Sequence, residues 1–300
     1  MNTEQLIARV AGGDIKSLAR LISLVENEAE GYEALLQQLP GSPVKVTGIT
    51  GPPGAGKSTL TDALIEAEVE AGKRIGVLCV DPASPFHQGA LLGDRIRMNQ
   101  WYNNPSVYIR SLSSRGSLGG LSPKMIEITD VMRSAAFDQI YVETVGVGQS
   151  EVEIAGLADT TVVVLVPEGG DDIQDMKAGL MEIADIFVVN KSDRPGAETF
   201  IRHLRSMCTP DFSRRAIPII KTIATQREGI GAILSAIRQQ QDQPQAADKK
   251  LRLLTEKLYR LISKKRMEDL TSDILMQRMQ EVMNEPGFNL YRFAATIAAS

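Results

Sequence analysis

The feature that most constrains this chain is a glycine-rich stretch at residues 51–59 (GPPGAGKST), between an apolar segment and an amphipathic one. Residues 44–49 (VKVTGI) are predicted to form a buried strand, and the helical spacing of the apolar residues that follow the stretch predicts a helix. A G-x-x-x-x-G-K-S/T pattern in the order strand, loop, helix is typical of a phosphate-binding loop, or P-loop, because backbone N–H groups at the helix N-terminus can point at phosphate oxygens. The alternative is a chance glycine-rich turn, which the flanking elements disfavour.

The residues of this loop have separate expected uses. Glycines allow tight backbone geometry and leave room for a phosphate to approach the chain. Lys57 would reach the β- and γ-phosphates, and the Ser58 hydroxyl would take one position on Mg²⁺. The candidate nucleotide-binding residues of the loop are Gly51, Pro52, Pro53, Gly54, Ala55, Gly56, Lys57, Ser58 and Thr59.

From residue 44 to residue 240, short β-branched runs alternate with helical patterns. Near-continuous apolar runs such as 160–166 (TTVVVLV) suit strands that are covered on both faces, as in parallel sheets. The alternation predicts an α/β fold, a P-loop NTPase with a mostly parallel, doubly wound sheet, whose ligands bind at the carboxyl ends of the strands. The candidate strands are 44–49, 74–80, 106–111, 137–142, 160–166, 186–190 and 216–221.

Helical regions are predicted on both sides of this P-loop domain, which we place at 44–240. Residues 1–43 are expected to form a helical cap of two or three helices that ends in a Pro/Gly-rich turn. Residues 246–300 are expected to form a helical extension, in which a leucine stripe with 3-4-3 spacing begins at Leu251. Such a stripe fits either a packing face within the chain or the seam of a dimer.

A second motif, N-K-x-D at residues 190–193, follows the sixth predicted strand and is typical of guanine recognition. The Asp193 carboxylate can accept hydrogen bonds from the ring N1–H and the exocyclic amine of guanine, a pair of donors that adenine lacks. Asn190 is expected near the purine N7, where it would also tie loops together, and the Lys191 stem is expected to cover the base. Ala224, after the last strand, is a weaker candidate. The chain is therefore predicted to bind GTP and GDP.

Three further carboxylates follow predicted strands. In P-loop nucleotidases a carboxylate at a strand end holds Mg²⁺ or its water, and a glycine shortly after it presents its N–H to the γ-phosphate. Glu143 and Gly146 have this spacing, and Asp81 and Asp94 are candidates for additional metal or water-ordering groups. For each acid the alternative is a helix N-cap or a solvated loop residue. The candidate metal-binding residues are Ser58, Asp81, Asp94 and Glu143.

The residue that follows Gly146 bears on the rate of GTP hydrolysis. Ras-like proteins carry a Gln there, which orients the attacking water. This chain has Val147 instead, and the nearest glutamine is Gln149. We therefore expect slow intrinsic GTP hydrolysis that a partner or a dimer contact accelerates.

The composition excludes several other classes of protein. The net charge of −4 gives no sign of a nucleic-acid or membrane-surface partner. The two cysteines have no paired spacing, which argues against a disulfide framework or a zinc site. The N-terminal sequence lacks the features of a secretory signal, and no apolar run approaches membrane-spanning length. We therefore expect a cytoplasmic protein.

Three longer segments add to the two motifs: VDPASPFHQGALLGDRIRM, VETVGVGQSE and GGDDIQDMKAGLMEIAD. With them the chain resembles, over nearly its whole length, the MeaB/ArgK family of GTPases. The resemblance implies a homodimeric GTPase chaperone that gates cofactor delivery to an adenosylcobalamin-dependent acyl-CoA mutase, chiefly methylmalonyl-CoA mutase, and protects or reactivates it. It also implies a third switch at residues 169–179, with Asp171, Gln174 and Lys177. The candidate catalytic residues are Lys57, Asp94, Gly146 and Lys177.

Two other functions remain as alternatives at this stage. A GTP-dependent metallochaperone would need a Cys/His delivery cluster, whereas His87, His203 and both cysteines are isolated in the sequence. A kinase would need a phosphoacceptor pocket and an activating base, and neither is recognisable. The mutase chaperone is therefore the preferred reading of the sequence.

Overall fold

The computed structural model describes residues 3–81, 98–113, 124–144, 153–167, 178–208, 216–243, 245–267, 269–284 and 288–299. The chain divides into two compact units, Met1–Leu253 and Leu254–Ser300. The first contains the sheet and the predicted site, and the second consists of helices.

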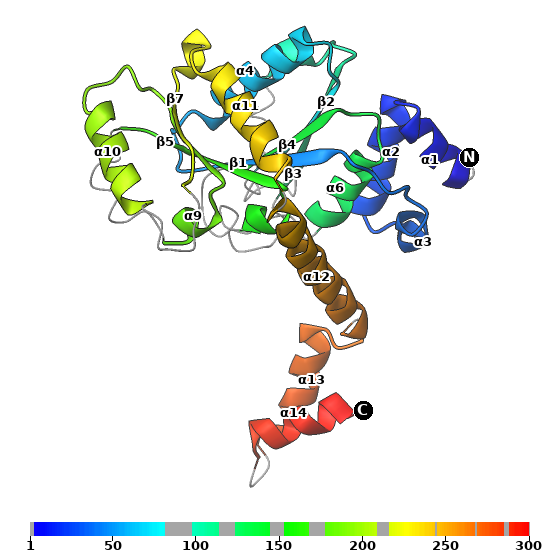
Figure 1. The fold of residues 1–300 in the computed structure, drawn as a ribbon. Helices are drawn as coiled ribbons and strands as arrows, with labels where there is room; N and C mark the ends of the chain where they lie inside the picture. The colour runs from blue at the N-terminus through cyan, green and yellow to red at the C-terminus, as the bar shows by residue number, and fades with distance from the viewer. Residues whose placement is uncertain are drawn as a thin grey trace. The chain divides into compact units, whose positions relative to one another are not determined.

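The first unit is built on a seven-stranded sheet in the order β3-β2-β4-β1-β5-β6-β7 (Figure 1). Every pair of neighbouring strands is parallel. The strands are β1 (Lys45–Thr50), β2 (Ile75–Asp81), β3 (Val107–Ser113), β4 (Gln139–Glu143), β5 (Thr160–Leu165), β6 (Ile186–Val189) and β7 (Ile219–Lys221). This confirms the predicted doubly wound sheet. β7 is shorter than predicted and begins after Pro218, because a proline has no N–H to donate to the ladder.

Helices cover both faces of this sheet, as the alternation of apolar residues requires. Val162 and Val164 of β5 pack into one hydrophobic cluster with α4 and α11. Val163 and Leu165, which point the other way, pack into a second cluster with α10. The helices of the first unit are α1 (Thr3–Ala11), α2 (Ile15–Glu26), α3 (Tyr32–Leu36), α4 (Lys57–Glu70), α6 (Met125–Arg133), α9 (Ala178–Ile183), α10 (Ala197–Met207) and α11 (Ile230–Gln241), with short 3-10 turns η1 (Asn99–Trp101), η2 (Ile154–Gly156) and η3 (Ala224–Gln226).

The N-terminal helices form part of the same core. Leu18, Leu21 and Ile22 of α2 are fully buried or nearly so, in a cluster that also includes residues of α6 and β4. Asp14 caps α2, since its carboxylate accepts a hydrogen bond from the backbone N–H of Lys16. A second hydrogen bond, from the Ser17 hydroxyl, holds the pKa of Asp14 below its ordinary value. The predicted helical cap is therefore packed against the sheet.

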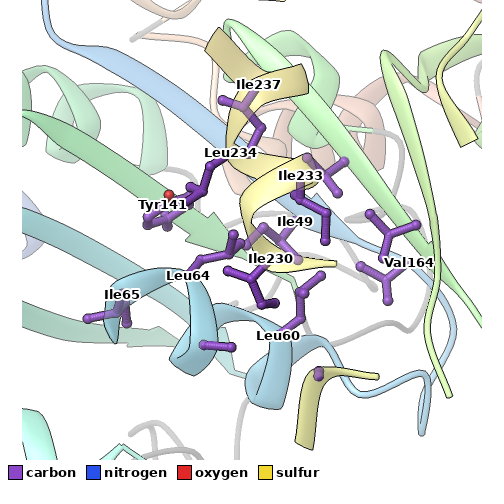
Figure 2. Close-up of a cluster of buried hydrophobic side chains, with 14 of the residues drawn as sticks. Ile49, Leu60, Leu64, Ile65, Tyr141, Val164, Ile230, Ile233, Leu234 and Ile237 are labelled. Carbon is purple, nitrogen blue, oxygen red and sulfur yellow. The ribbon is translucent and has the colours of Figure 1, made fainter. Parts of the chain in front are cut away.

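The cluster under α4 fixes the start of that helix against the strand ends. Figure 2 shows Leu60 and Leu64 of α4 and Ile233 of α11 pointing toward side chains of the strands, among them Ile49 and Tyr141. Tyr141 is completely buried, and desolvation raises the pKa of its hydroxyl far above the ordinary value. Because α4 cannot shift without disturbing this core, its first turn has a fixed position beside the ends of β1 and β4.

The second unit carries its apolar side chains on the outside. The helix α12 (Gln245–Arg266) begins before the boundary, and α13 (Ser272–Val282) and α14 (Leu290–Ala299) follow it. Thr271 caps α13 by accepting a hydrogen bond from the N–H of Ile274. The exposed large apolar residues of this unit are Leu254, Leu258, Tyr259, Leu261, Ile262, Met267, Ile274, Met276, Met283, Phe288, Leu290 and Tyr291. Within the described residues, no helix combines the length and the apolar character needed to cross a membrane.

Candidate nucleotide site

The backbone of the P-loop needs glycine at two positions in particular. Gly51 has a φ of 138°, and a Cβ at this position would lie 2.1 Å from the carbonyl oxygen of Val164. Gly56 has a φ of 87°, and a Cβ there would lie 2.4 Å from Nδ2 of Asn190. Both positions combine a backbone conformation that side chains disfavour with a close neighbour. The loop is therefore held tightly between β5 and the residue that follows β6.

Lys57 and Ser58 begin α4 directly after this loop, and both are buried. The Lys57 ammonium donates to the carbonyl oxygens of Gly51, at 2.8 Å, and of Pro52, at 3.0 Å. Thr59 is exposed on the other side of the first turn. A cation and the N-terminus of a fourteen-residue helix thus meet at the loop, and both favour an anionic ligand.

Glu143, the last residue of β4, meets this first turn from the sheet. It lies opposite Ile49 in the register of β1 and β4, and it is buried. One carboxylate oxygen accepts a hydrogen bond from the Ser58 hydroxyl at 2.5 Å. The hydroxyl of Thr61 lies 2.8 Å from the other oxygen and 2.9 Å from the carbonyl oxygen of Lys57, so it can donate to either. The predicted metal-binding residues Ser58 and Glu143 are therefore brought together.

Thr61 was not predicted from the sequence. It lies one turn after Lys57 in α4 and is fully buried. The only sequence signal for Thr61 is its spacing: it is a polar residue four positions after Lys57, between the apolar positions Leu60 and Leu64. A threonine in that place is compatible with ordinary helix packing, so only the position of Glu143 gives it a role.

The groups at this corner fit a magnesium ion. Mg²⁺ prefers oxygen ligands and is commonly held by one or two protein side chains together with phosphate oxygens. The Ser58 hydroxyl and the Glu143 carboxylate are ligands of that kind. Asp81 ends β2 at the same edge of the sheet, where Cys79 is in register with Glu143. In the described part of the chain, no group of three or more His, Cys, Asp or Glu side chains could hold a metal by itself.

Five predicted site residues lie outside the described residues. They are Asp94, Gly146, Asp171, Gln174 and Lys177. Their roles therefore remain predictions from the sequence.

The guanine-recognition motif begins directly after β6 and contacts the P-loop. Asn190 is buried; its side-chain N–H donates to the carbonyl oxygen of Ala55 at 2.9 Å, and its side-chain oxygen accepts from the N–H of Ala224 at 3.1 Å. Lys191 has a φ of 54°, and its ammonium donates to the carbonyl oxygen of Gly54 at 2.8 Å. Asp193 is exposed. One asparagine thus joins the three loops that were predicted to contact phosphate and base.

Comparison with known proteins identifies the family. Residues 18–283 match the family described as Methylmalonyl Co-A mutase-associated GTPase MeaB. The chain belongs to the MeaB family. It is 46% identical over 247 residues to a Pyrococcus abyssi protein named as a GTPase, and the alignment covers 80% of this chain and 76% of that protein.

The chain is also similar to a fused enzyme and to a solved structure. The chain is 38% identical over 237 residues to the fused isobutyryl-CoA mutase of Geobacillus kaustophilus, in an alignment that covers 73% of this chain and 22% of that larger protein. A crystal structure of a LAO/AO transport system kinase matches with a TM-score of 0.71 and 23% identity, and 99% of each chain is covered. The latter likeness supports the fold. The P-loop fold and the MeaB-family assignment predicted from the sequence are thus confirmed.

Proposed function

We propose that this MeaB-family GTPase binds and hydrolyses GTP with Mg²⁺, and that its nucleotide state is transmitted to an adenosylcobalamin-dependent acyl-CoA mutase. The observation that carries the nucleotide part is the position of Asn190, which is hydrogen-bonded to both the P-loop and the loop of Ala224. A guanine held by residues 190–193 would thereby be in register with a phosphate chain on the P-loop. The family and its motifs support GTP over ATP.

In this mechanism the residues of the first turn of α4 exchange partners when nucleotide binds. The Lys57 ammonium would leave the carbonyl oxygens of Gly51 and Pro52 for the β- and γ-phosphates. The Ser58 hydroxyl would turn from Glu143 toward the metal, while Thr61 continues to hold the other oxygen of that carboxylate. Bound Mg²⁺ would neutralise the charge that develops on the phosphates. Glu143 would hold the ion or one of its waters in place.

Residues predicted only from the sequence complete the proposal. Asp81 and Asp94 would order the metal or its water, and the N–H of Gly146 would contact the γ-phosphate. Asp171, Gln174 and Lys177 would form the switch that links nucleotide state to the partner. Val147 occupies the position of the water-orienting glutamine of Ras-like proteins, so intrinsic hydrolysis should be slow.

The mutase part of the proposal is supported by the family and by a relative. The family description names methylmalonyl-CoA mutase, and a protein that shares a homologous segment is a fused isobutyryl-CoA mutase. Fusion of two activities in one chain is consistent with association of the separate proteins. We therefore propose a mutase of this cofactor class as the partner, with gating of cofactor loading and protection or reactivation as the output.

The function is tested by calorimetric titration of the purified protein with GDP, GTP and ADP in the presence of Mg²⁺. We expect GDP and GTP to bind and ADP to bind at least about a hundredfold more weakly, because adenine cannot satisfy the Asp193 carboxylate. A binding assay with a purified adenosylcobalamin-dependent acyl-CoA mutase should then detect a complex whose affinity depends on the nucleotide. Equal binding of ADP and GDP would contradict the base assignment. A nucleotide-binding protein that never binds such a mutase would contradict the partner.

The helix α12 supports a proposal of homodimerisation. The stripe that begins at Leu251 continues through Leu254, Leu258 and Leu261, and all four side chains are exposed. Because exposed apolar surface of this extent in a helical unit marks an interface, we propose that a second copy of the chain covers it. The exposure of these leucines supports the dimer seam over a packing face within the chain.

The dimer is tested with Leu254→Glu and Leu258→Glu combined. Two carboxylates in an apolar seam would be desolvated without partners, so the double variant should be a monomer at concentrations where the wild type is a dimer. Light scattering coupled to size-exclusion chromatography measures the mass. Ser263→Glu is the matched control, since helical spacing places residue 263 on the side of α12 opposite the stripe. A monomeric wild type, or a dimeric double variant, would contradict this proposal.

A further inference from the structure

An arginine of the loop that contains Ala224 reaches back to the helix of the P-loop. Arg227 directly follows η3, has a φ of 61°, and pairs with two acids one turn apart on α4. Its guanidinium lies 3.5 Å from Oδ2 of Asp62 and also forms an ion pair with Glu66. A left-handed backbone is disfavoured for a residue with a side chain. The two acids therefore help to keep this turn in the conformation in which Ala224 contacts Asn190.

Asp62 has a second set of partners on its other oxygen. Oδ1 accepts hydrogen bonds from the side chains of Gln100 and Trp101, each at 2.7 Å. These two residues belong to η1, which in the sequence follows residues 82–97. The Asp62 side chain is only 18% exposed, and Trp101 is buried. One carboxylate thus connects α4, the loop after β7 and η1.

We propose that Asp62 is a positioning residue that couples the loop of Ala224, through Arg227, to η1. Guanine binding, which would order the loop of Ala224, would favour the Arg227–Asp62 contact and thereby stabilise the position of Trp101. The coupling rests on the proposed function of the site, because it assumes that guanine is the ligand of this loop. It adds a route, separate from the phosphates, by which base recognition can influence η1.

The contribution of these contacts is expected in positioning rather than in stability. The Arg227 side chain is 41% exposed and that of Glu66 is 34% exposed. Ion pairs with this exposure add little to the free energy of unfolding. A loss of Arg227 should therefore leave the protein folded while the loop of Ala224 samples other conformations, which lowers the affinity for the base.

The test compares Arg227→Ala with Arg238→Ala. Arg238 belongs to α11, and the ion pair that the structure describes for it joins it to another acid of α4, Glu68, at 3.5 Å, and not to the loop of Ala224. We expect Arg227→Ala to weaken GDP binding by about three- to tenfold, as for other residues that modulate coupling. Arg238→Ala should change it less than about twofold, since distant sites act independently. Calorimetry with GDP and Mg²⁺ measures both, and thermal unfolding confirms folding.

Trp101 provides a readout that a purely structural role would not change. It is the single tryptophan of the chain, so its fluorescence reports on η1 alone. Saturating GDP should shift the emission of the wild type, and the shift should be lost in Arg227→Ala and kept in Arg238→Ala. Arg227→Lys is the second variant if alanine prevents folding, because one ammonium replaces the fork that contacts both acids; it should also weaken GDP binding and reduce the shift.

The outcomes separate this proposal from the one on which it rests. A wild-type protein that does not bind GDP would overturn the proposed function. A wild-type protein that binds GDP, with unchanged affinity and an unchanged emission shift in the Arg227 variants, would overturn the coupling alone. An absence of any emission change in the wild type on GDP binding would also overturn it.

Discussion

Replacing Asp193 with Asn is expected to change the preferred nucleotide from GTP to xanthosine triphosphate. Xanthine has a carbonyl at C2 where guanine has an amine, and an asparagine amide can donate to that carbonyl. The affinity for GTP should fall on the order of a hundredfold, because the amide is uncharged, accepts only one of the two hydrogen bonds and turns a donor toward the exocyclic amine. Asn190 and Lys191 keep their contacts with Ala55 and Gly54, so the loop itself should be unchanged.

The measurement is a competition between GTP and xanthosine triphosphate for the wild-type and variant proteins with Mg²⁺. Asp242→Asn is the matched control, since it makes the same change at another exposed aspartate, at the end of α11. The control should retain the wild-type preference. If Asp193→Asn leaves the ratio of the two affinities where it was, Asp193 does not read the base.

The fold was predictable because its determinants are local. Runs such as 160–166 are apolar on both faces, so they could be recognised as strands of a covered parallel sheet without knowing their neighbours. The glycines of the P-loop are also local, since Gly51 and Gly56 have conformations that the motif requires. The predicted start of β7 was wrong because Pro218 has no N–H, an effect that outweighs the apolar pattern around it.

The contacts that connect the motifs were only partly predictable. A role for Asn190 in tying loops together follows from its motif, and its two hydrogen bonds have that form. By contrast, Thr61 and Asp62 resemble ordinary polar residues of an amphipathic helix. Their partners, Glu143 and Arg227, are far away in the sequence, and no periodic pattern links them. Such pairs depend on the register of β1 with β4 and on the turn of η3.

Replacing Glu143 with Gln is expected to lower the rate of GTP hydrolysis by about a hundredfold, in the range found when one preorganised electrostatic group is removed. The amide has nearly the shape of the carboxylate but no charge, so Mg²⁺ or its water would be held weakly beside Ser58. GDP should still bind, since Lys57 and the helix N-terminus are unchanged. The loss should be partly recovered at high Mg²⁺ concentration, which distinguishes weakened metal binding from a folding defect.

Single-turnover hydrolysis over a range of Mg²⁺ concentrations measures this effect, because the intrinsic reaction is expected to be slow. Glu68→Gln is the matched control: it changes another buried glutamate, on α4, whose partners are Lys73 and Arg238 rather than Ser58. This control should affect stability without changing the Mg²⁺ dependence. The Glu143 carboxylate also accepts a hydrogen bond from Thr61, so it could serve only as a structural partner of α4. That role would be indicated if Glu143→Gln hydrolysed GTP at the wild-type rate and with the wild-type Mg²⁺ dependence. The metal would then be held elsewhere.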